Sequence, residues 1–151
     1  MKCHVILCHK KNSLISKGIR FITCSYWNHS AILVNNFIYE AVFPRIRKIR
    51  YSEWIDINEN VETKSIEFEL INDPNEVVGK SYDLGIFINE LLFYFFARIN
   101  GKTSKIAKFF SNRNNENKWF CFEFSAYCVG KKKYWSANGL TFDKKSYICK
   151  T

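Results

Sequence analysis

The stretch His29–Val42, HSAILVNNFIYEAV, carries the clearest local structural signal in the chain. Two runs rich in β-branched and aromatic residues, 29–34 and 37–42, flank the dipeptide Asn35-Asn36. Asparagine tolerates the left-handed backbone conformation that a two-residue hairpin turn requires. The stretch therefore predicts an antiparallel β-hairpin that turns at the two asparagines.

The register of this hairpin decides which side chains share a face of the sheet. A turn at the two asparagines places Ala31 opposite Glu40 and His29 opposite Val42. Because residues two apart in a strand share a face, His29 and Glu40 become diagonal neighbours, roughly 7–8 Å apart at the backbone. Both side chains are long enough to close this gap with a hydrogen bond. One face is expected to carry His29, Ala31, Leu33, Ile38, Glu40 and Val42, and the other Ser30, Ile32, Val34, Phe37, Tyr39 and Ala41.

A histidine bonded to a carboxylate has two interpretations. The carboxylate fixes the tautomer of the imidazole and leaves the second ring nitrogen available as a base. Without a nucleophile, an ordinary surface pair across a hairpin is the simpler interpretation of His29 and Glu40. A catalytic interpretation therefore needs a third residue.

Cys121 is the candidate nucleophile. It opens the helical run CFEFSAYCVG (121–130), after the polar segment SNRNNENK (111–118) and Trp119-Phe120. A thiol in the first turn of a helix lies near the positive end of the helix dipole, which favours the thiolate. A nearby histidine would complete an activated Cys–His pair. Cys128, two turns further along roughly the same face, is expected to be buried in the core.

The remaining pattern predicts an α+β fold. A short apolar run indicates a buried strand at 3–8, and polar–apolar alternation indicates a half-exposed strand at 64–70. Helices are expected at 13–23, about 84–99, 103–110 and 119–129, the last ended by Gly130, and a strand at 140–149. Helices that accompany several antiparallel strands are typical of the α+β class.

Length and composition predict one globular domain over residues 1–151, since domains most often have roughly 100–150 residues. Hydrophobic residues make up 47% and aromatic residues 17%, which excludes a disordered chain. The apolar stretch 84–99 is shorter than the roughly 20 residues of a membrane span, so a buried helix is expected. The start, MKCH, has no signal-peptide pattern, which predicts a cytoplasmic protein with reduced thiols.

Charge is distributed unevenly along a chain of net charge +9. Residues 1–50 carry nine basic and one acidic side chain, 51–90 carry two and ten, and 101–151 carry eleven and three. A nucleic-acid-binding protein needs its positive charge on one continuous face. Two basic blocks around an acidic one do not favour that partner.

The segment Cys3-His4 to Cys8-His9 contains four potential metal ligands. On a strand, residues 3 and 8 point to opposite faces, so the four side chains cannot converge. No CxxC pair occurs in the chain. We therefore expect no metal site, and we expect Cys3 and Cys8 to be buried or half-buried.

Four motifs, in this order, resemble a known family. They are Trp27-Asn-His29, Ile38-Tyr-Glu40-Ala41, Gly79-Lys-Ser-Tyr-Asp83 and Trp119-Phe-Cys-Phe-Glu123. Together they resemble the circularly permuted papain-like cysteine hydrolases of the NlpC-type superfamily, which occur in bacteria, phages and poxviruses. The histidine precedes the cysteine, which is the mark of the permutation. The resemblance covers about residues 3–130.

The resemblance implies a fold and a site. The fold would be an antiparallel sheet or partial barrel packed against helices, with the nucleophile at a helix N-terminus. Cys121 would be the nucleophile, His29 the base and Glu40 the orienting residue, with Tyr82 and Trp119 at the oxyanion and substrate site. Phe122 stands where many relatives have serine, which bears on substrate preference.

The implied reaction is acyl transfer from an amide, in a peptide, peptidoglycan or isopeptide, through a thioester and without a cofactor or metal. Two alternatives stay open. The same triad would also serve a lipid acyl hydrolase or acyltransferase, with the helix at 84–99 lining an acyl pocket. A non-catalytic protein would instead use the basic segments 45–50 (RIRKIR) and 131–133 (KKK) to bind nucleic acid or an acidic partner.

Overall fold

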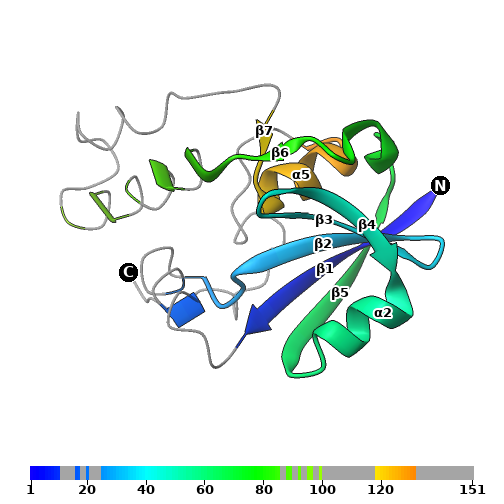
Figure 1. Ribbon diagram of the computed structural model, residues 1–151, viewed down its shortest axis with the longest axis horizontal. Coiled ribbons are helices and arrows are strands. Elements are labelled where there is room, and N and C mark those ends of the chain that lie inside the picture. Colours follow the sequence, from blue (N-terminus) through cyan, green and yellow to red (C-terminus); the bar gives the residue numbers. More distant parts are fainter. Residues whose placement is uncertain are drawn as a thin grey trace.

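The structure is a computed structural model that describes residues 1–10, 16–17, 20, 25–85, 88–89, 92, 95–96, 99 and 118–131. In this part of the chain the fold is mixed α+β: a seven-stranded sheet curls into a half-barrel and two helices accompany it (Figure 1). The order of strands across the sheet is β5-β1-β2-β3-β4-β6-β7. Every neighbouring pair is antiparallel except β6–β7, which is parallel. The elements are β1 (Lys2–Lys10), β2 (His29–Val34), β3 (Phe37–Val42), β4 (Arg45–Arg50), α2 (Tyr51–Ile57), β5 (Val61–Glu69), the 3-10 turn η1 (Pro74–Val77), β6 (Ser81–Tyr82), β7 (Lys118–Trp119) and α5 (Cys121–Cys128).

The predicted hairpin forms β2 and β3. Asn35 and Asn36 have φ angles of 46° and 67°, and two positive values are what a two-residue type I′ turn requires. The ladder pairs Val34 with Phe37 and continues inward through Leu33 and Ile32. The turn and its register are therefore confirmed.

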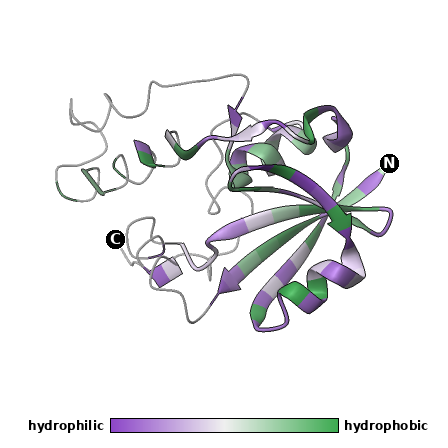
Figure 2. Cartoon of the chain, viewed as in Figure 1, coloured by the Kyte–Doolittle hydropathy of each residue, from purple (hydrophilic) through white to green (hydrophobic). Residues whose placement is uncertain are grey.

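The hydropathy pattern of the outer strand β5 is also confirmed. Figure 2 shows hydrophilic and hydrophobic bands alternating along this strand. Its isoleucine and phenylalanine, Ile66 and Phe68, are partly buried, whereas Glu67 and Glu69 are exposed. Charged side chains on an edge strand oppose pairing with another chain. β1, at the predicted position, lies between β5 and β2.

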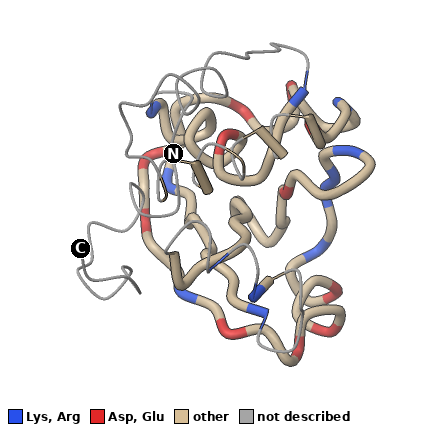
Figure 3. Tube along the Cα trace, turned by 90° about the vertical axis from the view of Figure 1, so that its left-hand side faces the viewer, with Lys and Arg blue, Asp and Glu red and all other residues tan. Residues whose placement is uncertain are grey.

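Charged residues of both signs are spread along the described trace. Figure 3 shows both Lys or Arg positions and Asp or Glu positions at several places along the trace of the described residues. The basic segment 45–50 forms the strand β4, in which Ile46 is buried and Arg45 and Arg50 are exposed. No helix of the described residues has the length and apolar character needed to cross a membrane.

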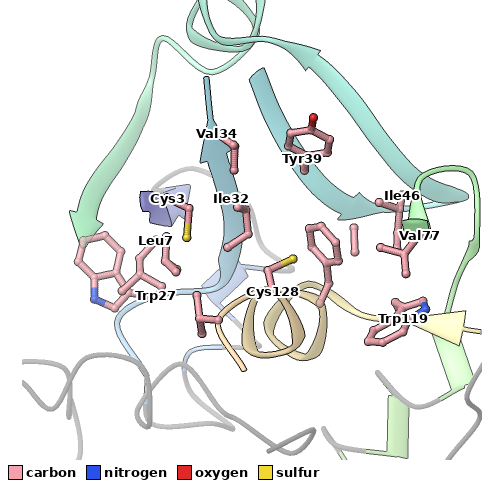
Figure 4. Packing of buried hydrophobic residues seen from close by; sticks show 14 residues of the cluster. Cys3, Leu7, Trp27, Ile32, Val34, Tyr39, Ile46, Val77, Trp119 and Cys128 are labelled. Atoms are coloured by element: carbon pink, nitrogen blue, oxygen red, sulfur yellow. The ribbon is translucent and has the colours of Figure 1, made fainter. Parts of the chain in front are cut away.

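The two faces of the β2–β3 hairpin support two separate apolar clusters, as its register predicts. The first face contributes Ile32, Val34 and Tyr39 to the larger cluster, which α5 covers with Phe124 and Cys128. Figure 4 shows Ile32 directed toward the helix, whereas the hydroxyl of Tyr39 points away from it. The second face contributes Ala31 and Ile38 to a smaller cluster. That cluster also contains Cys8 of β1 and Trp54 of α2.

The helix expected at 119–129 begins only at Cys121, because the backbone of Lys118 and Trp119 pairs with β6 as the strand β7. Its end is as expected, with Gly130 in the left-handed region at φ 67°. The described residues within 13–23 and 84–99 are helical, and the segments 103–110 and 140–149 lie outside the described residues. The strand β4 and the helix α2 were not predicted.

Candidate functional site

The hairpin brings His29 and Glu40 together. His29 is the first residue of β2, and Glu40 lies in the middle of β3. The His29 Nε2–H group donates a hydrogen bond of 2.9 Å to Glu40 Oε2. The diagonal contact predicted from the hairpin register is therefore present. Because Nε2 faces the carboxylate, Nδ1 is the ring nitrogen left to act as a base.

Glu40 is a buried carboxylate that accepts hydrogen bonds from three side chains. It is only 3% exposed. Arg47 donates from its Nε and one terminal nitrogen to Oε1, at 2.9 and 2.6 Å. Trp54 Nε1–H donates to Oε2 at 3.3 Å. Burial opposes the charged carboxylate, but the bonds from His29 and Arg47 outweigh it and lower the pKa of Glu40 to about 2.

Cys121 is the thiol that interacts with the imidazole of His29. It is the first residue of α5, follows the extended residue Phe120, and is 4% exposed. Burial disfavours the charged imidazolium of His29, yet the interactions with Cys121 and Glu40 outweigh burial and raise the pKa of His29 to about 10. The side chain of His29, which is 25% exposed, thus interacts with both a thiol and a carboxylate.

The position of α5 follows from its packing on β2. Ser30 of β2 and Ser125 of α5 are both fully buried, and their hydroxyls hydrogen-bond each other at 2.8 Å. Phe124, the largest fully buried side chain, fills the core beside them. Since Ser30 follows His29 directly, this contact places the start of α5 near the start of β2.

The structure places Tyr82 and Trp119 on the paired strands β6 and β7. Tyr82 packs against the small cluster of Phe120 and Cys121. Burial, together with nearby Cys121 and Asp83, raises the pKa of Tyr82, so that its hydroxyl keeps its proton at neutral pH. The ring of Trp119 instead belongs to the large core cluster and lies 4.8 Å from the ring of Tyr127.

Sequence reasoning missed Arg47 and Trp54. A usable signal existed for Arg47, because a second hairpin turning at Phe43-Pro44 pairs Val42 with Arg45 and Glu40 with Arg47, as the structure shows. No local pattern pointed to Trp54. Its contact depends on how α2 packs over the second face of the sheet.

The other described cysteines are buried thiols without such a partner set. Cys3 and Cys128 belong to the large core cluster and Cys8 to the smaller one, so the expected burial of Cys3 and Cys8 is confirmed. Burial raises the pKa of each of the three. Across the described residues, no group of three or more His, Cys, Asp or Glu side chains is placed to hold a metal ion. Cys24 and Cys149 lie outside the described residues.

Comparison with known proteins gave no match to a family model, to a curated protein or to a solved structure.

Proposed function

We propose that this chain is a cysteine-dependent amide hydrolase in which Cys121, His29 and Glu40 form a catalytic triad. The observation that carries the proposal is the imidazole of His29, which bonds a buried, ionised carboxylate through Nε2 and contacts a thiol at a helix start. A structural His–Glu pair has no need of that thiol. The three side chains come from β2, β3 and α5, and the sequence motifs singled out the same three.

The reaction proceeds by acyl transfer. His29 Nδ1 takes the proton of Cys121, and the thiolate attacks the carbonyl carbon of an amide. A C–S bond forms and the carbonyl electron pair moves to oxygen. When the carbonyl re-forms, the C–N bond breaks and His29 gives its proton to the departing amine. Water, deprotonated by His29, then attacks the thioester, which releases the acid and restores the thiol.

We assign two donors to the oxyanion of this reaction. The backbone N–H of Cys121 is one, because the first N–H groups of a helix have no partner within it. The protonated hydroxyl of Tyr82 is the other, since Tyr82 packs against Cys121. In other enzymes the loss of one such donor costs about 3–4 kcal/mol of transition-state stabilisation.

The proposal also assigns the chain to the circularly permuted papain-like hydrolases. It is supported by the curled, mainly antiparallel sheet and by a histidine on a strand that precedes, in sequence, a cysteine at a helix start. A lipid acyl hydrolase would use the same triad. The described residues provide no observation that favours the lipid substrate.

Thiol reactivity tests the triad without a known substrate. The folded protein is treated with iodoacetamide from pH 5 to 9, and the labelled cysteine is mapped by mass spectrometry. We expect Cys121 to label first and His29→Ala to slow it on the order of tenfold at pH 6. The matched control is His4→Ala, which removes a β1 histidine that bonds Ser65 instead. Labelling of Cys121 at the rate of Cys128, or with indifference to His29, contradicts the proposal.

A substrate screen then separates the two acyl chemistries. Peptide anilides are compared with short- and long-chain acyl esters, and Cys121→Ala serves as the blank. Turnover of anilides supports the amide hydrolase. Selective turnover of long-chain esters would replace it with the lipid hydrolase, on the same triad.

A further inference from the structure

The side chain of Arg47 makes a contact that the triad alone does not require. Arg47 lies directly opposite Glu40 in the β3–β4 ladder. Its guanidinium reaches Oε1 of that carboxylate through two nitrogens, at 2.9 and 2.6 Å. The arginine is 41% exposed at its side chain, whereas Glu40 is 3% exposed. The guanidinium therefore covers the buried carboxylate on its solvent side.

The two oxygens of Glu40 have separate partners. Oε1 accepts only from Arg47 among the bonds described, and Oε2 accepts from His29 at 2.9 Å and from Trp54 at 3.3 Å. A guanidinium presents its donors in a rigid planar fork, so a two-nitrogen contact fixes the carboxylate in orientation as well as in charge. With Oε1 held, Oε2 is the oxygen that faces the imidazole.

We propose that Arg47 is a positioning residue that acts through Glu40: it holds the carboxylate in the orientation and ionisation state that lets Oε2 align His29 against Cys121. The proposal rests on the proposed function. Trp54, on α2, supports the same oxygen that bonds His29. Arg47 and Trp54 thus connect β4 and α2, neither of which carries a member of the triad, to the pair formed by His29 and Cys121.

The charged and titratable groups around Glu40 come from three elements. They are His29 of β2, Arg47 of β4 and Cys8 of β1. Arg47 is the one group of this set that keeps its positive charge at every pH of interest. Without it, Oε1 would be buried without a donor, and the carboxylate would either turn toward solvent or bind a proton. Both outcomes weaken its bond to His29.

The test compares two arginines of the same strand. Arg47→Met is the probe, and Arg45→Met is the matched control, because Arg45 is exposed and pairs across the ladder with Val42. Iodoacetamide labelling of Cys121 is followed from pH 5 to 9 for each variant, after circular dichroism has confirmed the fold. We expect Arg47→Met to slow labelling about tenfold at pH 6 and to move the lower limb of the profile up by about one pH unit. Arg45→Met should reproduce the wild-type profile.

A second pair of variants shows whether Arg47 acts through Glu40. In a Glu40→Gln background, Arg47→Met should cause no further slowing, because the group that it positions is already altered. Arg47→Lys keeps the charge but loses the fork, and its profile should lie between those of wild type and Arg47→Met. Arg47→Lys also tests whether Arg47 positions Glu40 if Arg47→Met does not fold.

Three results would overturn the proposal. They are a folded Arg47→Met with the wild-type profile, an Arg47→Lys that matches an Arg45→Lys control, and an equal slowing by Arg47→Met with and without Glu40. If the proposed triad itself is wrong, the labelling experiment gives a different result. In that case the wild-type labelling of Cys121 would already be indifferent to His29→Ala, before any arginine is changed.

Discussion

The two cysteines of α5 share one helix and nearly the same burial, yet their surroundings differ. Cys121, the first residue, is 4% exposed, and Cys128, the last, is 0% exposed. Cys128 lies in the large apolar cluster, where burial, and secondarily Cys3 and Asp73, raise its pKa. Cys121 instead interacts with the imidazole of His29 and raises the pKa of that ring. Burial therefore does not separate the two thiols; a basic partner and a place at the helix start do, and these two features are typical of reactive thiols.

The largest effect expected from this comparison is on which thiol reacts. Cys121→Ala should remove almost all rapid iodoacetamide labelling of the folded protein at pH 7, a decrease on the order of a hundredfold. Cys128→Ala should leave that labelling unchanged and instead lower the free energy of unfolding by about 1 kcal/mol, because it opens a small cavity. Peptide mapping measures the first effect and urea denaturation the second. Rapid labelling that persists in Cys121→Ala would show that Cys121 is not the rapidly reacting thiol.

A second prediction uses the pH dependence of stability to test the partner of Cys121. The pKa of Glu40 falls from 4.5 to about 2 on folding, so its contribution is present above pH 4.5 and is lost as pH falls toward 2. The pKa of His29 rises from 6.5 to about 10, so its contribution is present below pH 6.5 and is lost as pH rises toward 10. Both contributions depend on the bond between the two side chains.

Glu40→Gln should therefore flatten the pH dependence of the free energy of unfolding. We expect the difference in free energy of unfolding between wild type and Glu40→Gln to be greatest from about pH 5 to 6.5 and to shrink on both sides. Urea denaturation at five pH values between 3 and 9 measures it. Glu53→Gln, on the exposed surface of α2, is the matched control. A difference that stays constant with pH would show that the His29–Glu40 bond does not couple to protonation.

The smallest effect concerns the contact that holds α5 on β2. Ser30→Ala or Ser125→Ala alone leaves a buried hydroxyl without its partner, which costs about 1–3 kcal/mol of stability. The double variant should lose less than the sum of the two, since it removes both hydroxyls. Thermal or urea unfolding measures these losses, with the exposed Ser52→Ala as control. Additive losses would show that the two hydroxyls do not interact.

The hairpin was predictable because its information is local. Two asparagines between β-rich runs fix the turn, the turn fixes the register, and the register fixes the face of His29 and Glu40. The start of the helix that bears Cys121 was placed two residues too early. That error arose because Lys118 and Trp119 pair with Ser81 and Tyr82 of β6, which lie 37 residues earlier in the sequence. Local pattern does not contain such a partner.

Arg47 and Trp54 illustrate the remaining limit in physical terms. The RIRKIR segment stands out in the sequence by its charge, whereas its strand register is what directs one of its arginines onto Glu40. The short helix α2 has exposed isoleucines at Ile55 and Ile57 beside the buried Trp54. The hydropathy pattern of α2 therefore does not identify the face of the helix that packs against the sheet. Contacts between elements depend on the whole fold, and the local patterns of a single sequence do not reveal them.

The pairing of β1 between β2 and β5 has a consequence for the order in which the molecule can form. Residues 2–10 pair with residues 61–69 along their whole length. One edge of β1 therefore has no partner strand until residues 61–69 have been synthesised. Contacts so distant in sequence close slowly, because the entropy of a long loop must be lost first. The helix with Cys121 comes later still and docks on a sheet that the first 82 residues largely build. The nascent chain thus carries His29 and Glu40 early and gains its thiol partner last.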